Sequence, residues 1–412
     1  MNVEKNIQKC WDFVFNKLFN QKTKLIYEYV TENSENGAFA HLPTKEEIAR
    51  HYPNPCGWYT GMEDGDINGG IMLEAVMHRY ELTKEASMKK YANDLYEGMM
   101  LNATLSEEKG FLIRSRLPED GVTHYINSSR DQYTHWIESM THFYFSELSN
   151  ATQREQIKQV LVEFAKKAER DVTKENAYCL LDELGAPALV CSMYGEIYKD
   201  DIMWHESCRL PMFYMAAYVT SGDLHWLEKY HSVRDWGLTT AEDIRIEPRI
   251  YEGVFALMQM QISVRLLYDY ETEVEYKQRY GALMEKVASS IDWYLNDAKA
   301  WVKNGYDMPS TVTPWRKVPK EFTREENWSL VGRKVIMPNV WKASEIDDVR
   351  KKLRNSSESI ITQSLCPNRE IPQSQVDAFL DILSNVSFES PFGYIATGYC
   401  LAWWSLKKAG RV

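Results

Sequence analysis

The feature that most constrains the fold is a set of long segments whose apolar side chains recur every three to four residues, the spacing of an amphipathic helix. The first member of each pair is rich in small and apolar residues, and the second carries frequent Lys and Glu. The pattern predicts helical hairpins in which an inner helix is backed by a solvated outer one. The clearest pairs are 68–82 with 85–103, 133–146 with 151–170, and 251–270 with 274–296.

The turns between paired segments resemble one another, which indicates a weak internal repeat. In each, a Tyr ends one segment, a Thr lies in the turn and a second Tyr lies on the next segment. These triplets are Tyr80, Thr83 and Tyr91; Tyr218, Thr220 and Tyr230; and Tyr268, Thr272 and Tyr280. We therefore expect an all-α fold, an (α/α)6 toroid of helical hairpins.

Outside these segments the helical pattern is weaker. Residues 110–116 are the clearest strand-like stretch, which we expect to be an extended loop at one end of the ring. Prolines interrupt the pattern between 304 and 389, although 344–354, 373–383 and 393–408 still favour helices. Because no low-complexity linker is present, we expect one domain spanning 1–412.

Composition limits the classes of partner and the compartment. Apolar residues make up 44% of the 412 residues, enough for a large packed core, and the net charge of −11 argues against nucleic acid and anionic membranes. The interrupted apolar pattern of the N-terminal segment favours an amphipathic helix over a signal peptide, and no apolar run suggests a membrane span. Seven scattered cysteines without a CxxC pair favour a reducing compartment. We expect a soluble cytoplasmic protein.

A glycine-rich loop at 57–70 concentrates aromatic and acidic side chains before a predicted inner helix. Indole and phenol rings offer the flat faces on which sugars stack, and carboxylates bind hydroxyl groups. The candidate residues here are Trp58, Tyr59, Glu63, Asp64 and Asp66. Two alternatives stay open: Asp66 or Asn68 only caps the helix, or the stretch binds calcium. The calcium pattern is incomplete, since Glu74 falls one residue short of the twelfth loop position.

A second polar cluster lies at 124–138. Asp131, His135 and Glu138 are spaced i, i+4 and i+7, so they share one face of a helix that starts near Asp131. Alternatively, Asp131 is only an N-cap, or Asp131 and His135 form a metal pair. The neighbouring candidates for substrate binding are His124, Arg130, Gln132, Tyr133 and Trp136.

Arginines near this cluster in the sequence suggest an acidic ligand. Arg114 and Arg116 join Arg130 as guanidinium groups that suit a carboxylate or sulfate on a sugar, although salt-bridged or solvated arginines are equally common. Weaker candidates are Asp182, Glu183, His205, Glu206, Arg249, Glu252, Trp315 and Arg316. The sequence has no P-loop, dinucleotide fingerprint, HExxH or GxSxG motif, which argues against the corresponding enzyme classes.

The hairpin rhythm, the small-residue segment 69–74 and the Arg130-Asp131-Gln132 entry to an inner helix resemble the six-hairpin glycosidase superfamily. The resemblance covers most of the chain and implies a cavity at one end of the ring, with acids from the starts of inner helices. Within the superfamily, the chain resembles unsaturated glucuronyl and rhamnogalacturonyl hydrolases. In those enzymes an Asp near the start of an inner helix donates a proton, which implies this role for Asp131. The second acid and the aromatic pattern of those hydrolases have no clear match here.

These observations predict a glycoside hydrolase that acts on oligosaccharides, including acidic ones, without a cofactor or metal. Asp131 is the expected general acid, and Asp64 or Glu63 the opposing base. We expect Trp58 and His135 to line the same cavity as these carboxylates. A lyase or epimerase is the alternative if His135 and Tyr133 dominate the pocket, and a non-catalytic scaffold that binds a glycan or protein is another. The sugar, its linkage and the oligomeric state do not follow from the sequence.

Overall fold

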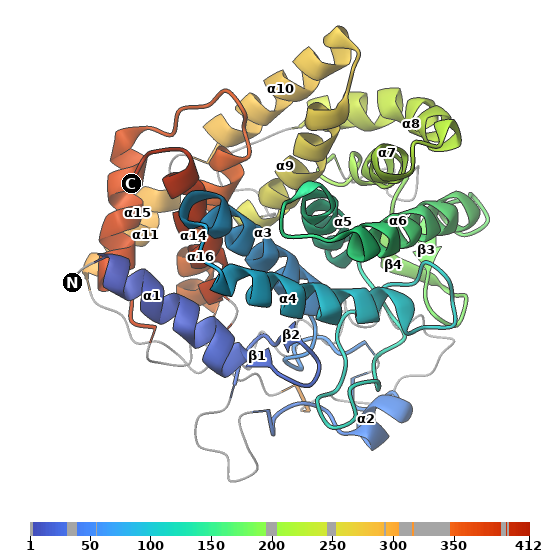
Figure 1. Ribbon diagram of the computed structural model, residues 1–412, viewed down its shortest axis with the longest axis horizontal. Helices are drawn as coiled ribbons and strands as arrows, with labels where there is room; N and C mark the ends of the chain where they lie inside the picture. The colour runs from blue at the N-terminus through green and yellow to red at the C-terminus, as the bar shows by residue number, and fades with distance from the viewer. Residues whose placement is uncertain are drawn as a thin grey trace.

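The computed structural model describes residues 3–30, 39–54, 56–194, 204–244, 253–291, 294–304, 315–316, 347–388, 393 and 395–412. The fold is all-α, as the sequence predicts, and the strands of the described part form only two small antiparallel sheets (Figure 1). The weak candidates Arg249 and Glu252 lie outside the described residues.

Six helices contact one another in a cyclic order. Each packs against the next, and the last packs against the first (Figure 1). In this order they are α3 (Gly65–Thr83), α5 (Arg130–Phe145), α7 (Arg209–Ser221), α9 (Gly253–Tyr270), α14 (Asp347–Ser364) and α16 (Ile395–Lys408). The predicted inner segments near 68, 133 and 251 correspond to α3, α5 and α9.

A second set of helices packs on these six. They are α4 (Ser87–Thr104) on α3, α6 (Ala151–Asp171) on α5 and α7, α8 (Leu224–Glu242) on α7, α10 (Val274–Ser289) on α9, α11 (Tyr294–Lys303) on α14, and α1 (Val3–Phe13) on α16. Helix α15 (Gln373–Asn385) packs against α11 and α1. The three predicted hairpins therefore correspond to α3–α4, α5–α6 and α9–α10.

The remaining described elements are short. They are the π-helical turn η1 (Val14–Leu18), β1 (Phe19–Asn20), β2 (Leu25–Ile26), α2 (Lys45–Ala49), β3 (Cys179–Leu181) and β4 (Pro187–Ser192). Strand β1 pairs with β2, and β3 pairs with β4 across an irregularity in register. The strand-like stretch 110–116 is not a strand. Its consecutive side chains Phe111, Leu112 and Ile113 are all buried, whereas a half-buried strand would alternate.

Local signals fix where the helices begin and end. The Ser129 side chain caps α5 by accepting a hydrogen bond from the backbone N–H of Gln132. Asn150 and Gln153 form a reciprocal capping box at the start of α6. Lys84 and Gly222 adopt the left-handed conformation directly after α3 and α7, which ends those helices and turns the chain into the next one.

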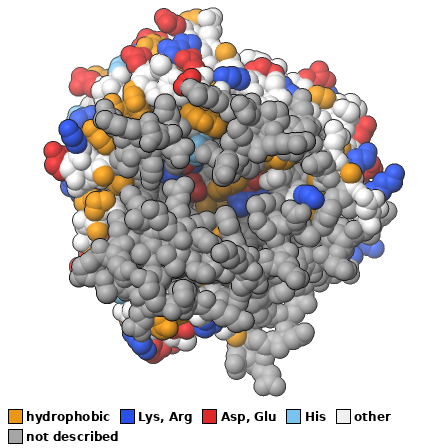
Figure 2. Space-filling model, turned by 180° about the vertical axis from the view of Figure 1, so that it is seen from behind, with side chains coloured by type: hydrophobic (Ala, Val, Ile, Leu, Met, Phe, Trp, Pro, Cys, Tyr) orange, Lys and Arg blue, Asp and Glu red, His pale blue; other side chains and the backbone are white. Residues whose placement is uncertain are grey.

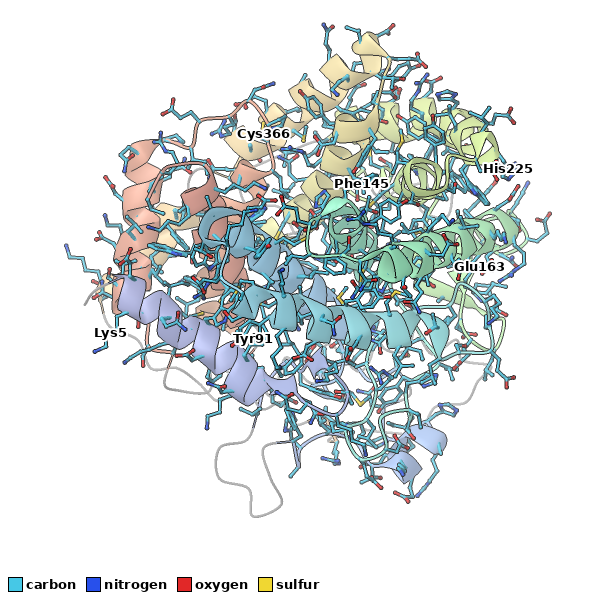
Figure 3. The ribbon with its side chains drawn as sticks, in the orientation of Figure 1. Lys5, Tyr91, Phe145, Glu163, His225 and Cys366 are labelled. Atoms are coloured by element: carbon cyan, nitrogen blue, oxygen red, sulfur yellow. The ribbon has the colours of Figure 1, made fainter. Side chains whose placement is uncertain are left out.

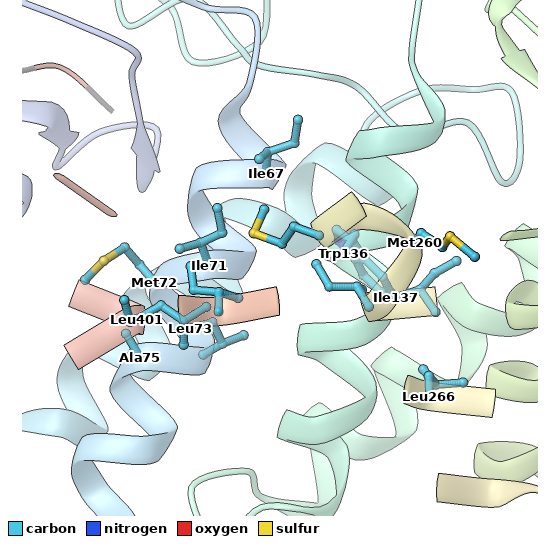
Figure 4. Close-up of a cluster of buried hydrophobic side chains, with 14 of the residues drawn as sticks. Ile67, Ile71, Met72, Leu73, Ala75, Trp136, Ile137, Met260, Leu266 and Leu401 are labelled. Atoms are coloured by element: carbon cyan, nitrogen blue, oxygen red, sulfur yellow. The ribbon is translucent and has the colours of Figure 1, made fainter. Parts of the chain in front are cut away.

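Small residues let α3 approach α5 closely. A β-carbon added to Gly70 would lie 2.8 Å from the carbonyl oxygen of His135, so only glycine fits at this crossing. Around it, Ile71 and Leu73 of α3 pack in one buried cluster with Trp136 of α5 and Leu401 of α16 (Figure 4). The cluster fixes the first turns of α3 and α5 relative to each other.

The structure describes all seven cysteines; each is buried, and none forms a disulfide. The Sγ atoms of Cys10 and Cys400 lie 3.7 Å apart where α1 packs on α16.

Within the described ranges, no helix combines the length and the apolar character that crossing a bilayer requires.

Candidate functional site

The two polar clusters of the sequence meet where α3 and α5 begin. The Gln132 side chain donates to Asp64 Oδ1 at 3.0 Å and to the backbone oxygen of Glu63 at 3.1 Å. Its carbonyl oxygen accepts from the backbone N–H of Asp66 at 3.1 Å. One side chain of α5 thus ties the loop before α3 to the first turn of α5.

A buried arginine orients the two carboxylates of that loop. Arg114 Nη2 lies 2.9 Å from Glu63 Oε1 and 3.3 Å from Asp64 Oδ1. The Arg114 side chain is 7% exposed, whereas Glu63 and Asp64 are 16% and 21% exposed. The second Glu63 oxygen accepts from the backbone N–H of Tyr59 at 2.8 Å. Both carboxylates are therefore held in place while part of each stays accessible.

Asp131 belongs to a second charged network, at the start of α7. Its Oδ1 lies 2.5 Å from Arg209 Nη1, and Arg209 Nε lies 2.6 Å from Glu206 Oε2. Arg130 Nε lies 3.0 Å from the same Glu206 oxygen. Although burial opposes a charge on Glu206, Arg130 and Arg209 hold its pKa well below the usual range. Asp131 is the most exposed member, at 32%, and its side chain does not cap α5.

The starts of α3 and α5 thus present three oriented carboxylates, Glu63, Asp64 and Asp131, and Arg209 at the start of α7 holds the last of them. Because Asp131 directly precedes Gln132, the residue that binds Asp64, the two networks adjoin. The space-filling view shows a hollow near the middle of one face of the molecule, with acidic and basic side chains visible inside it (Figure 2). Such a set of carboxylates can bind hydroxyl groups and transfer protons.

His135 and Glu138 continue the Asp131 face of α5 into a cavity of about 460 Å³ between α3, α5, α9, α14 and α16. Burial lowers the pKa of His135 to about 3, so its imidazole is neutral, and neither ring nitrogen has a hydrogen-bond partner among the described residues. Burial, and next the charge of Glu74, raise the pKa of Glu138 to about 8. Asp131 and Glu138 are seven positions apart on the helix, an axial distance of roughly 10 Å.

The same cavity holds a Glu74–His142 ion pair. His142 Nδ1 lies 2.7 Å from Glu74 Oε1. Burial alone would lower the pKa of His142, yet the Glu74 carboxylate raises it to about 9. Burial alone would also raise the pKa of Glu74, and His142 lowers it instead. Phe145, at the end of α5, lines the cavity (Figure 3).

Several residues that the sequence suggests for substrate binding form hydrogen bonds within the core instead. Asp66 is fully buried and accepts from Asn102. Arg116 donates to Asn102 and to three backbone oxygens. The Tyr133 hydroxyl bonds to the backbone of Gly110 and Leu112, and the Trp136 indole donates to Met99. Asp66 Oδ1 has no partner among the described residues, but the residue is 0% exposed, and the other three side chains use their polar groups within the core. The proposed site therefore does not include these four residues.

The other aromatic and histidine candidates have mixed surroundings. Trp58 is 6% exposed, and its buried indole N–H has no acceptor among the described residues. Tyr59 is held with a positive φ of 63° beside Glu63. His124 lies 3.1 Å from Glu183, so its partner is a residue of the β3–β4 connection. Trp315 and Arg316 contact His41 and Glu47.

The geometry does not favour either metal site considered from the sequence, the calcium loop at 57–70 or the pair of Asp131 and His135. Asp64 faces Arg114 and Asp66 faces Asn102, so the carboxylates of the calcium-like loop do not converge. Asp131 is paired with Arg209. In the described part of the chain, the group of side chains arranged closely enough to hold an ion is Glu74, Glu138 and His142.

Sequence reasoning missed Arg209, Glu74 and His142 and gave Glu206 little weight. Arg209 follows Glu206 by one helical turn, a signal that becomes informative only when α7 is placed beside α5. A clearer signal is the Glu-x-x-x-His spacing, which occurs at Glu74 and His78 and again at Glu138 and His142. Two such pairs on neighbouring inner helices place four polar side chains toward each other.

No protein-family model matches the chain, and no curated protein matches its sequence. Among solved structures, it is similar to a sugar epimerase from a ruminal bacterium, with 13% identity, a TM-score of 0.46 and coverage of 74% of this chain and 82% of that one. It is also similar to a β-1,3-1,4-glucanase from Paenibacillus sp. X4, with 9% identity, a TM-score of 0.46 and coverage of 100% and 92%. Likenesses this low identify no family and carry no argument about activity.

Proposed function

We propose that the protein is a glycoside hydrolase that acts on oligosaccharides, built as a single-domain (α/α)6 toroid. The observation that supports this best is the link from Gln132 to Asp64, since it brings the carboxylates of two distant loops to one edge of the helix ring. Hydrolysis of a glycosidic bond needs such a pair, one carboxyl group to protonate the leaving oxygen and another to activate water or attack the sugar. The cyclic contacts of the six inner helices support the toroid.

We assign roles from the surroundings of each group. Asp131 is the most exposed carboxylate and is held by Arg209, so it is positioned to contact substrate. Glu63 and Asp64 share Arg114 at the start of α3. In this proposal Asp131 transfers the proton to the leaving group, and Asp64 or Glu63 acts opposite it. Gln132 and Arg114 position Asp64 and Glu63. Arg209 holds Asp131, and Arg130 holds Glu206 beside it. Trp58 and Tyr59 provide the apolar wall.

A panel of neutral and uronic-acid-containing oligosaccharides tests the proposal. The purified protein is incubated with each sugar, and the products are identified by mass spectrometry. A hydrolase adds one water and yields two shorter sugars. Binding without any product would contradict the proposal and favour a non-catalytic glycan-binding scaffold.

One observation favours a second candidate activity, that of a lyase or epimerase. Both imidazole nitrogens of His135 are unpartnered among the described residues, and a lyase or epimerase needs a proton acceptor of this kind. Tyr133, the expected second member of that mechanism, is bonded to the backbone. The same panel distinguishes these activities, since a lyase yields an unsaturated product without adding water and an epimerase yields an isomer of unchanged mass.

We also propose a cytoplasmic location, supported by seven cysteines that form no disulfide with one another. Fractionation of cells that express the protein with an epitope tag tests it. Recovery with an extracytoplasmic marker would contradict this assignment.

A further inference from the structure

Two neighbouring inner helices each carry a glutamate and a histidine one turn apart, and the pairs face each other. Glu74 and His78 lie on α3, and Glu138 and His142 lie on α5, the helix that packs most extensively against α3. Residues four apart share a face of a helix, so all four side chains lie at one interface. This interface borders the cavity of about 460 Å³.

Three of these side chains converge closely. One ligand atom each from Glu74, Glu138 and His142 can be chosen so that all three lie within 4.8 Å of one another. Ligands on a zinc ion at about 2.0–2.1 Å lie roughly 3.3 Å apart in tetrahedral geometry, so small side-chain shifts would suffice. The cavity beside them leaves room for the remaining coordination positions.

Glu138 points to an occupant that the chain itself does not supply. Its side chain is 4% exposed, and no described residue donates a hydrogen bond to its carboxyl group. His135, one turn earlier on the same helix and 1% exposed, lines the same cavity with both ring nitrogens unpartnered among the described residues. Buried polar groups normally find partners, because leaving one unpaired costs about 1–3 kcal/mol.

The cations around the cavity already have partners. Arg265 Nε lies 2.7 Å from Asp269 Oδ2, and Lys408 Nζ lies 2.7 Å from Glu81 Oε2. Neither therefore forms an ion pair with Glu74 or Glu138, and the cation that pairs with Glu74 is His142, a member of the group itself. His78 Nε2 lies 4.0 Å from Glu74 Oε2 and is a nearby nitrogen that could complete the ligand set.

We propose that Glu74, Glu138 and His142 bind a divalent transition-metal ion of the zinc type, with its open coordination positions facing the cavity. A mixed set of carboxylate oxygens and an imidazole nitrogen suits zinc or cobalt better than magnesium or calcium, which prefer oxygen ligands alone. The site lies on the cavity side of α3 and α5 and does not depend on the proposed hydrolase activity.

The test uses the full chain after removal of metals with a chelator. Equilibrium dialysis against Zn²⁺, followed by elemental analysis, gives the stoichiometry and affinity, and Co²⁺ reports the ligand geometry through its visible absorption. We expect one ion per chain. Glu138→Gln and His142→Gln should each weaken binding by on the order of 100-fold or more, since losing only a partner of a ligand already costs about 10–100-fold.

Glu81→Gln is the matched control, because Glu81 lines the same cavity but pairs with Lys408. It should bind zinc as the unmodified chain does. Circular dichroism confirms that each variant is folded. Absence of zinc binding by the folded unmodified chain would overturn the proposal, and so would unchanged binding in folded Glu138→Gln and His142→Gln. Oligosaccharide cleavage, measured separately, does not enter either outcome.

Discussion

Asp131 Oδ1 lies 2.5 Å from Arg209 Nη1, and Arg209 in turn lies 2.6 Å from Glu206. The Arg209 side chain is 1% exposed, so it carries a buried charge between two acids that come from different helix starts. This single side chain couples the start of α7 to the Asp131 edge of α5.

Arg209→Met should therefore destabilise the protein strongly. The variant removes the cation that pairs with Asp131 and one of the two arginines that pair with Glu206. Breaking a buried ion pair typically lowers the free energy of unfolding by about 3–5 kcal/mol. Urea unfolding measures the change. Lys84→Met is the control, since Lys84 and Glu147 form an exposed pair whose loss should cost about 1 kcal/mol or less. Equal, small losses in both variants would contradict the structural role of Arg209.

Arg114 and Arg116 should respond differently to the same substitution. Arg116 donates to Asn102 and to the backbone oxygens of Gly98, Gly121 and Thr23, which a lysine cannot reach together. Arg116→Lys should lower the free energy of unfolding by on the order of 3 kcal/mol and leave KM unchanged. Arg114→Lys, beside Glu63 and Asp64, should instead lower kcat/KM about tenfold. Steady-state kinetics and urea unfolding together distinguish these outcomes, and the reverse pattern would refute the assignment.

The sequence reveals the helices but not how the ring closes. Apolar spacing and the repeated Tyr and Thr turn signals predict the hairpins because they are local properties of the chain. The packing of α16 on α3 joins residues more than three hundred positions apart, for example Thr397 and Asn68, and no local pattern encodes such a contact. The short β3–β4 pair escaped prediction because the sequences of its strands, 179–181 and 187–192, do not alternate between apolar and polar residues.

The sequence also locates both polar clusters without separating site residues from core residues. Asp64 and Asp66 are two positions apart, but each helical residue turns by about 100°, so Asp66 lies on another face and is buried. Arg114 and Arg116 likewise differ only in what surrounds them. That information comes from packing, which a pattern of residue types cannot supply.

The crossing of α3 and α5 should tolerate no side chain at Gly70. A methyl group there would lie 2.8 Å from the backbone oxygen of His135, so Gly70→Ala should cost about 1–3 kcal/mol by forcing the helices apart. Gly281→Ala is the matched change within α10, where the nearest atom, on the Tyr268 ring, lies 3.4 Å away. It should be neutral or stabilise the protein by up to about 1 kcal/mol. Thermal unfolding compares the two, and a neutral Gly70→Ala would contradict the close approach.

Buried His135 should make the protein sensitive to acid. Its folded-state pKa is lowered to about 3, below the unfolded value near 6.5, so unfolding takes up a proton and stability falls as the pH drops below 6.5. Between pH 7 and pH 5 the unmodified chain should lose about 2 kcal/mol more than His135→Asn. Urea unfolding across this range measures the difference, with exposed His225→Asn as control. Parallel stability curves for the unmodified chain and His135→Asn would contradict the neutral buried imidazole.

The central claim is that Asp131 transfers a proton during glycosidic bond cleavage, and kcat of Asp131→Asn tests it most directly. On the oligosaccharide that the panel identifies, kcat should fall by about 10²–10⁴ while KM and the folded structure persist, since Arg209 keeps its contact with Glu206. Asp377→Asn, an exposed site on α15, should leave kcat unchanged. A folded Asp131→Asn variant that turns over at a near-normal rate would contradict the account.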